Sequence, residues 1–403
     1  MRDEVPDVVR APADRPRIEE ALRLRRWALR VLASRSPDPP AGTAATWRLF
    51  LQAERCALPV KTALRHQQRW EQLPVQARES LDAFATRELQ EVLSARATLA
   101  AVDRLAADLS VEVVVLKGGV AACSDARAVA LADIDLLVRP SEAERFAGAL
   151  DDAGYSAHGA GSVLHLSKRV ARETLPVEVH RTLDETDEEW VGAVWERTRP
   201  LECTETLRRL GARDHTWHLL THVVVQHPFR AGAIRDLHII AGALAECDPA
   251  ELASLRDATD QRPESETFRD VLTLAQEFSG EQEPEDRFRR RAAAAYAFHE
   301  YGGRLPGPTI FKSDVATSTF AMLQGPSAYG RWYRRVMWRR VAGRSRFPPI
   351  AWLEARSRRV GRMARVASRA VRLAVAAPLA LVLTVASRRY GAAGERAVGL
   401  GED

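Results

Sequence analysis

Apolar residues recur at three- and four-residue spacing in two N-terminal segments, residues 17–35 and 44–108. Trp47, Phe50 and Leu51 show this spacing. Because it gathers apolar side chains on one face of a helix, both segments are predicted to be helical. The stretch SPDPPAG at 36–42 separates them, since proline and glycine interrupt helices.

The pattern changes to short β-branched runs after residue 110. Strands are predicted at 111–116 (VEVVVL), 133–138 (DIDLLV), 164–170 and 177–183, with a helix at 141–150 among them. Helical spacing returns at 206–278, and a charged break follows at 280–290. The chain is therefore predicted to be α+β, with a small mixed-sheet domain flanked by helical regions.

These changes of sequence pattern divide the chain into four regions. Its 403 residues are more than one ordinary hydrophobic core accommodates. We expect an N-terminal helical region at 1–108 and an α/β domain at 109–200. A helical domain at 201–280 is expected to cover the site of that α/β domain. A basic helical tail rich in arginine and tryptophan is expected at 281–403.

Carboxylates occupy alternate positions of a predicted strand. Asp133 and Asp135 flank Ile134 and therefore point to the same side. Glu178 lies between two valines on a later strand. Buried acids without a partner or metal are costly, so this pattern indicates a metal-type site. Two or three carboxylates are enough to hold Mg²⁺ for phosphoryl or nucleotidyl transfer.

A glycine pair follows the first predicted strand. Gly118 and Gly119 would let the backbone approach a phosphate closely, and Lys117 adds a point charge there unless it only ends the strand. His180 lies two residues after Glu178, on the same face. It would either assist the site or hydrogen-bond within it.

Several motifs in this order resemble the nucleotidyltransferase superfamily of DNA polymerase β. Within it, the chain is most similar to a bacterial family described as uncharacterised nucleotidyltransferases, over residues 45 to 270 and most strongly over 111 to 183. A His-containing helix and an Asp-bearing helix, THVVVQH at 221–227 and IRDLH at 234–238, fit its C-terminal region. The motifs that carry the resemblance are LKGGVAA at 116–122, DIDLLV at 133–138, AGY at 153–155 and VEVHRTL at 177–183.

This resemblance implies a two-metal Mg²⁺ site at Asp133 and Asp135, with Glu178 as the third carboxylate. It also implies that Gly118 and Gly119 contact the triphosphate of an NTP co-substrate such as ATP. The implied reaction moves a nucleoside monophosphate to an unidentified acceptor, which is a small molecule, peptide or protein.

One position departs from the family, which commonly has an arginine about four residues before the DID motif. Val129 stands there, and Arg127 is the candidate substitute. Two alternatives to nucleotidyl transfer stay open. One is a catalytically inactive scaffold that its basic tail recruits to a membrane or partner, and the other is phosphotransfer to a small molecule.

Three histidines of the 206–278 region lie on one predicted helical face: His215, His218 and His222. Zinc binding is one interpretation, but no HExxH-type acid accompanies them, so packed histidines are favoured. Asp236 is expected to pair with Arg235 rather than to act as a base.

The tail is basic, with fourteen arginines and one acid between 331 and 372, and an uncharged apolar run lies at 373–386. We expect peripheral membrane contact through 331–390 in preference to nucleic-acid binding, although a solvated helix packed on the core is the simplest interpretation. The charged N-terminus does not resemble a signal peptide. Four widely spaced cysteines predict free thiols and a cytoplasmic protein.

Overall fold

The computed structural model describes residues 15–35, 37–124, 128–158, 163–168, 174–183, 188–227, 231–262, 264–278, 282–302, 380–381 and 384–385. Helices and one mixed sheet make up these residues, which confirms the predicted α+β fold. The first fourteen residues and Arg127 lie outside the described residues. So does the expected membrane-contacting segment 331–390, apart from the two short pieces near 380.

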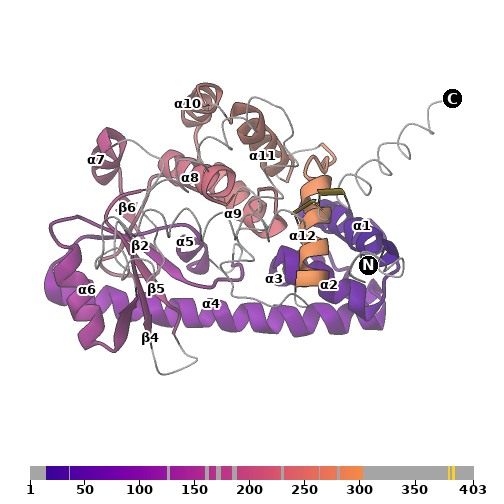
Figure 1. Ribbon diagram of the computed structural model, residues 1–403, viewed down its shortest axis with the longest axis horizontal. Helices are drawn as coiled ribbons and strands as arrows, with labels where there is room; N and C mark the ends of the chain where they lie inside the picture. The colour runs from indigo at the N-terminus through magenta and orange to yellow at the C-terminus, as the bar shows by residue number, and fades with distance from the viewer. Residues whose placement is uncertain are drawn as a thin grey trace, which may run out of the picture.

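The N-terminal part is helical, as predicted. The Thr43 side chain caps the second helix by accepting a hydrogen bond from the Thr46 amide. The last helix of this part is 35 residues long, about 50 Å at the usual rise. It runs beneath both the sheet and the other N-terminal helices (Figure 1). The helices are α1 (Arg15–Leu32), α2 (Ala44–Glu54), α3 (Ala57–His66), the 3-10 turn η3 (Trp70–Gln72) and α4 (Val75–Leu109).

A seven-stranded mixed sheet follows, with the order β3-β4-β5-β2-β1-β7-β6 in the described part of the chain. Its central strand β2 pairs antiparallel with β1 and parallel with β5. The strands are β1 (Val113–Val115), β2 (Ile134–Val138), β3 (Tyr155–His158), β4 (Val163–Lys168), β5 (Val177–His180), β6 (Arg199–Pro200) and β7 (Arg208–Arg209).

Both faces of the sheet are covered, so alternate residues of β2 enter two different cores. Ile134 and Leu136 pack with residues of α4 and of α6 (Ala143–Asp152). Leu137 points to the other face, where Trp195 of α7 (Glu188–Glu196) closes a smaller core. All five residues of β2 are buried as a result. A polar side chain on this strand therefore needs a partner inside the protein.

The second helical region packs on the N-terminal helices. Residues of α1, α2 and α3 share one hydrophobic core with residues from 219 to 297. Figure 1 shows α8 and α9 on the side of the sheet opposite α4. The elements of this region are α8 (Ala212–Thr221), the π-helix η5 (His222–Gln226), α9 (Ile234–Leu244), α10 (Pro249–Asp260), α11 (Ser265–Glu277) and α12 (Arg289–Gly302).

The prediction of four free thiols is wrong for one pair. Cys123, at the end of the short helix α5 (Gly118–Ala122), forms a disulfide with Cys203, and their Cα atoms lie 5.5 Å apart. Cys56 and Cys247 are free. Spacing along the sequence could not predict this contact, because the two cysteines are 80 residues apart and meet only in the folded sheet domain.

Among the described helices, none is both long and apolar enough to cross a membrane.

A buried glutamate links α4 to the start of α3. Glu88 is 4% exposed and accepts hydrogen bonds from the amides of Ala57 (3.2 Å) and Leu58 (2.7 Å). Burial raises the pKa of Glu88 to about 7, although these hydrogen bonds oppose the rise. The folded protein therefore holds this proton more tightly than the unfolded chain does.

We expect Glu88→Gln to flatten the pH dependence of stability between pH 4.5 and 8. In the wild type, the contribution of Glu88 is fully present below its ordinary pKa of 4.5 and is lost as the pH rises through about 7. The wild type should therefore lose about 3 kcal/mol relative to the variant over this range. Urea unfolding at several pH values measures the difference. Glu79→Gln, at an exposed position of the same helix, is the control, and parallel curves for wild type and Glu88→Gln would contradict the assignment.

Candidate functional site

Strand β2 places a carboxylate on the face of the sheet that looks away from α4. Asp135 is 6% exposed, and its neighbours Ile134 and Leu136 point into the opposite core. This is the alternation that the sequence predicted. An ionised carboxylate with so little contact with water requires charged or hydrogen-bonding partners.

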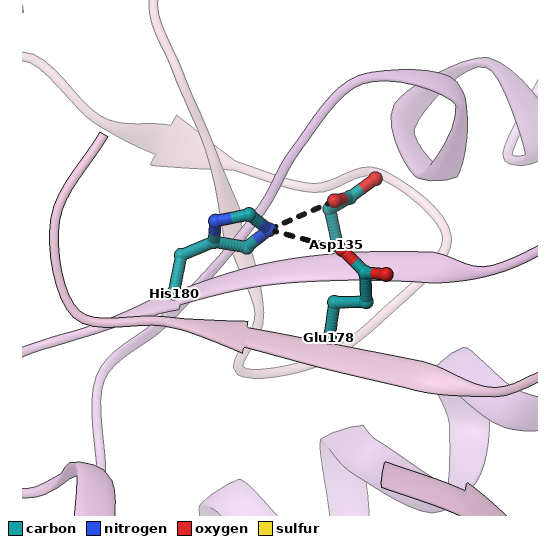
Figure 2. A group of neighbouring side chains, drawn as sticks. All are labelled: Asp135, Glu178 and His180. Atoms are coloured by element: carbon teal, nitrogen blue, oxygen red, sulfur yellow. Dashed lines mark hydrogen bonds and ion pairs between the residues drawn. The ribbon is translucent and has the colours of Figure 1, made fainter. Parts of the chain in front are cut away.

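Strand β5 supplies two further side chains of the site. Asp135 is the register partner of Glu178 in the parallel β2–β5 pair, and His180 follows two residues later. His180 Nε2 lies 2.8 Å from Asp135 Oδ1 and 3.7 Å from Glu178 Oε2 (Figure 2). One ligand atom from each of the three residues lies within 4.8 Å of the others. This group could hold a metal ion.

Lys117 binds the same carboxylate oxygen. Its Nζ lies 2.7 Å from Asp135 Oδ1. Burial raises the pKa of Asp135, but the charge of Lys117 and the hydrogen bond from His180 outweigh burial and hold that pKa well below its ordinary value. Lys117 has φ 51° and ψ −128°, a conformation that costs a non-glycine residue about 1–3 kcal/mol. Such strain is typical of functional sites.

Asp133 lies directly before β2 and is half-buried, outside the tight group of three residues. Burial raises its pKa, and the negative charges of Asp135 and Glu178 raise it further. The three predicted carboxylates therefore act on one another through space. A cation bound among them would relieve this repulsion.

The two glycines of the turn are needed for packing. A Cβ on Gly118 would lie 2.3 Å from Leu131 Cδ2, and one on Gly119 would lie 2.7 Å from Val115 Cγ1. Any larger residue would push the turn away from β1 and the segment before β2. The glycines thus let the turn between β1 and α5 pack closely against β1 and the segment before β2.

The chain matches the model of a protein family described as uncharacterised nucleotidyltransferases, over residues 45–280. The match includes α4, the sheet with its carboxylates and the helices α8 to α11. The chain belongs to this family. A nucleotidyltransferase function in the general sense follows from this membership. No curated protein and no solved structure matches the chain.

The helical region of this nucleotidyltransferase brings two histidines near the site, a contribution that sequence analysis missed. Burial lowers the pKa of His218 well below its ordinary value, and the positive charges of Lys117 and His180 lower it further. Burial and Lys117 do the same to His222, the first residue of the π-helix. Both rings are therefore neutral. Their shared helical face was visible in the sequence, but their neighbours across the fold were not.

His218 stands out among these side chains. It is 2% exposed, and its Nε2 has no hydrogen-bond partner among the residues that the structure describes. The metal-type group found in the described residues is that of Asp135, Glu178 and His180, rather than the three helix histidines considered for zinc. A buried nitrogen without a hydrogen-bond partner destabilises the fold rather than supporting it.

The structure also tests what the sequence predicted for Val129 and for the pair of Arg235 with Asp236. Val129, where the family commonly has an arginine, is fully buried in the large core shared by the helices. It cannot supply a charge to the site. Arg235 Nη1 lies 3.8 Å from Asp236 Oδ1, which confirms the expected ion pair.

We expect His218→Leu to keep the free energy of unfolding within about 1 kcal/mol of the wild type, or to raise it, because it removes an unsatisfied buried nitrogen. Leu220→Ala on the same helix is the control. Leu220 is fully buried, so its truncation should cost about 2–5 kcal/mol. Thermal and urea unfolding measure both. If His218→Leu costs as much as Leu220→Ala, the histidine is a packing residue.

Proposed function

We propose that this protein is a Mg²⁺-dependent nucleotidyltransferase that moves a nucleoside monophosphate from an NTP to an acceptor. The convergence of Asp135, Glu178 and His180, with Asp133 beside them, supports the proposal most directly. The family membership agrees with it. Nucleotidyl transfer needs a cation beside the phosphates, and this face of the sheet gathers the carboxylates that would hold one.

The residues present fit a divalent cation. Asp133, Asp135 and Glu178 offer carboxylate oxygens, the ligands that Mg²⁺ prefers. Burial raises the pKa of Asp133, and the negative charges of Asp135 and Glu178 raise it further. His180 Nε2 donates a hydrogen bond to Asp135 Oδ1 and so fixes the orientation of that carboxylate. Bound Mg²⁺ would neutralise charge on the phosphate oxygens and orient them.

The other side chains of the site have separate proposed roles. Lys117, which is paired with Asp135, supplies positive charge next to the turn at Gly118 and Gly119. Asp135 is a poor general base because its pKa is held low. Glu178 has a side chain that is 23% exposed and is therefore the carboxylate better placed to take a proton from an acceptor. The NTP phosphates would lie against Gly118 and Gly119.

The acceptor is proposed to enter from the side of the helical region. His218 and His222 lie on that side, and neutral imidazoles can accept a hydrogen bond from a hydroxyl or amine. A small molecule, a peptide or a protein side chain all provide such a group. We also propose that the basic tail at 331–390 brings the enzyme to an anionic membrane surface.

Isothermal titration with ATP, GTP, CTP and UTP tests the nucleotide site. We expect Mg²⁺-dependent binding of at least one NTP by the wild type. The double variant Asp133→Ala/Asp135→Ala should lose this binding by about 100-fold or more, because it removes two of the three carboxylates. The measurement needs no knowledge of the acceptor.

Glu142→Ala is the control, since Glu142 is an acid just after β2 that lies outside the carboxylate group. It should bind NTP as the wild type does. A folded wild type that binds no NTP, with or without Mg²⁺, would overturn the proposal and favour the scaffold function.

A further inference from the structure

Arg235 reaches the glycine turn from the helical region. It lies in the first turn of α9, and its side chain is 12% exposed. A Cβ placed on Gly118 would lie 3.5 Å from Arg235 Nη2. The guanidinium is therefore close to the turn, and its charge also acts on Asp133 across the site.

Lys117 alone leaves the phosphates of an NTP poorly neutralised. Its Nζ is held 2.7 Å from Asp135 Oδ1, in an ion pair that already satisfies a buried carboxylate. Arg235 Nη1 lies 3.8 Å from Asp236 Oδ1, within ion-pair distance. A guanidinium can bind two phosphate oxygens at once through its planar fork of N–H donors.

A buried network fixes the start of α9 and so the base of this side chain. Glu54 Oε2 accepts a hydrogen bond from the Ile234 amide at 2.8 Å. Glu54 Oε1 is bound by Arg25 Nη1 at 2.6 Å and by the Tyr296 hydroxyl at 2.7 Å. Arg25, Glu54 and Tyr296 are all at most 3% exposed. Helices α1, α2 and α12 thus hold the backbone next to Arg235 in place.

We propose that Arg235 binds the phosphates of the nucleotide beside Gly118, so that the phosphate site is built jointly by the sheet and the helical region. This inference rests on the proposed function, of which it names a binding residue. It also gives the helical region a direct role in holding the nucleotide, in addition to covering it.

Arg235→Ala and Arg235→Lys test the inference by titration with inorganic tripolyphosphate and with the preferred NTP, both with Mg²⁺. We expect Arg235→Ala to weaken both by about 10- to 100-fold, the usual effect of losing hydrogen bonds to a charged group. Arg235→Lys should recover part of the loss, because it keeps the charge without the fork. Binding of the unphosphorylated nucleoside should not change.

Arg256→Ala, which removes an exposed arginine from α10 of the same region, is the matched control and should bind as the wild type does. Equal affinity of Arg235→Ala and wild type, while Asp133→Ala/Asp135→Ala loses binding, would overturn the role of Arg235 and leave the proposed function standing. Equal weakening in Arg235→Ala and Arg256→Ala would also overturn it. A wild type that binds neither probe would overturn both proposals.

Discussion

The site depends on one buried carboxylate and the two groups that stabilise its charge. Asp135 lies on the central strand of a sheet covered on both faces, where an unpaired charge could not persist. Lys117 comes from the turn after β1 and His180 from β5, and both contact the same oxygen of Asp135. This shared oxygen ties the glycine turn, β2 and β5 together. The strained backbone at Lys117 is tolerated because that contact holds it.

The two faces of the sheet around Asp135 have different roles, since one packs in a core and the other carries the candidate site. One face of the sheet packs on α4 and α6 in an apolar core. The other face carries Asp135 and its neighbours, and the helical region of α8 and α9 lies on that side (Figure 1). Arg25 of α1 and Glu54 of α2 form an ion pair and bind the backbone of Gly232 and Ile234, which connects the helical region to α1 and α2. Long-range packing therefore decides how close Arg235 comes to the glycine turn.

Local patterns predicted much of this arrangement. The alternation in DIDLLV placed Asp135 and Ile134 on opposite faces, and VEVH placed Glu178 and His180 on one face, because side chains of a strand alternate. The two-residue strands β6 and β7 were missed, since Arg199–Pro200 and Arg208–Arg209 have no apolar alternation.

Contacts between segments that lie far apart in the chain could not be predicted from the sequence. The ion pair between Lys117 and Asp135 depends on the β1–β2 register, and the approach of Arg235 to Gly118 depends on helix packing. The disulfide of Cys123 with Cys203 is of the same kind. Each of these three contacts joins two residues, and the local sequence around either residue does not indicate the other.

The central claim is that this face of the sheet transfers a nucleotidyl group. The most direct measurement is ³¹P NMR of the preferred NTP incubated with the protein, Mg²⁺ and a panel of hydroxyl and amine acceptors. We predict that pyrophosphate appears with the wild type and that Asp135→Asn, which keeps the shape of the side chain and removes its charge, abolishes it. Release of a nucleoside diphosphate, or pyrophosphate at an undiminished rate from Asp135→Asn, would contradict the account.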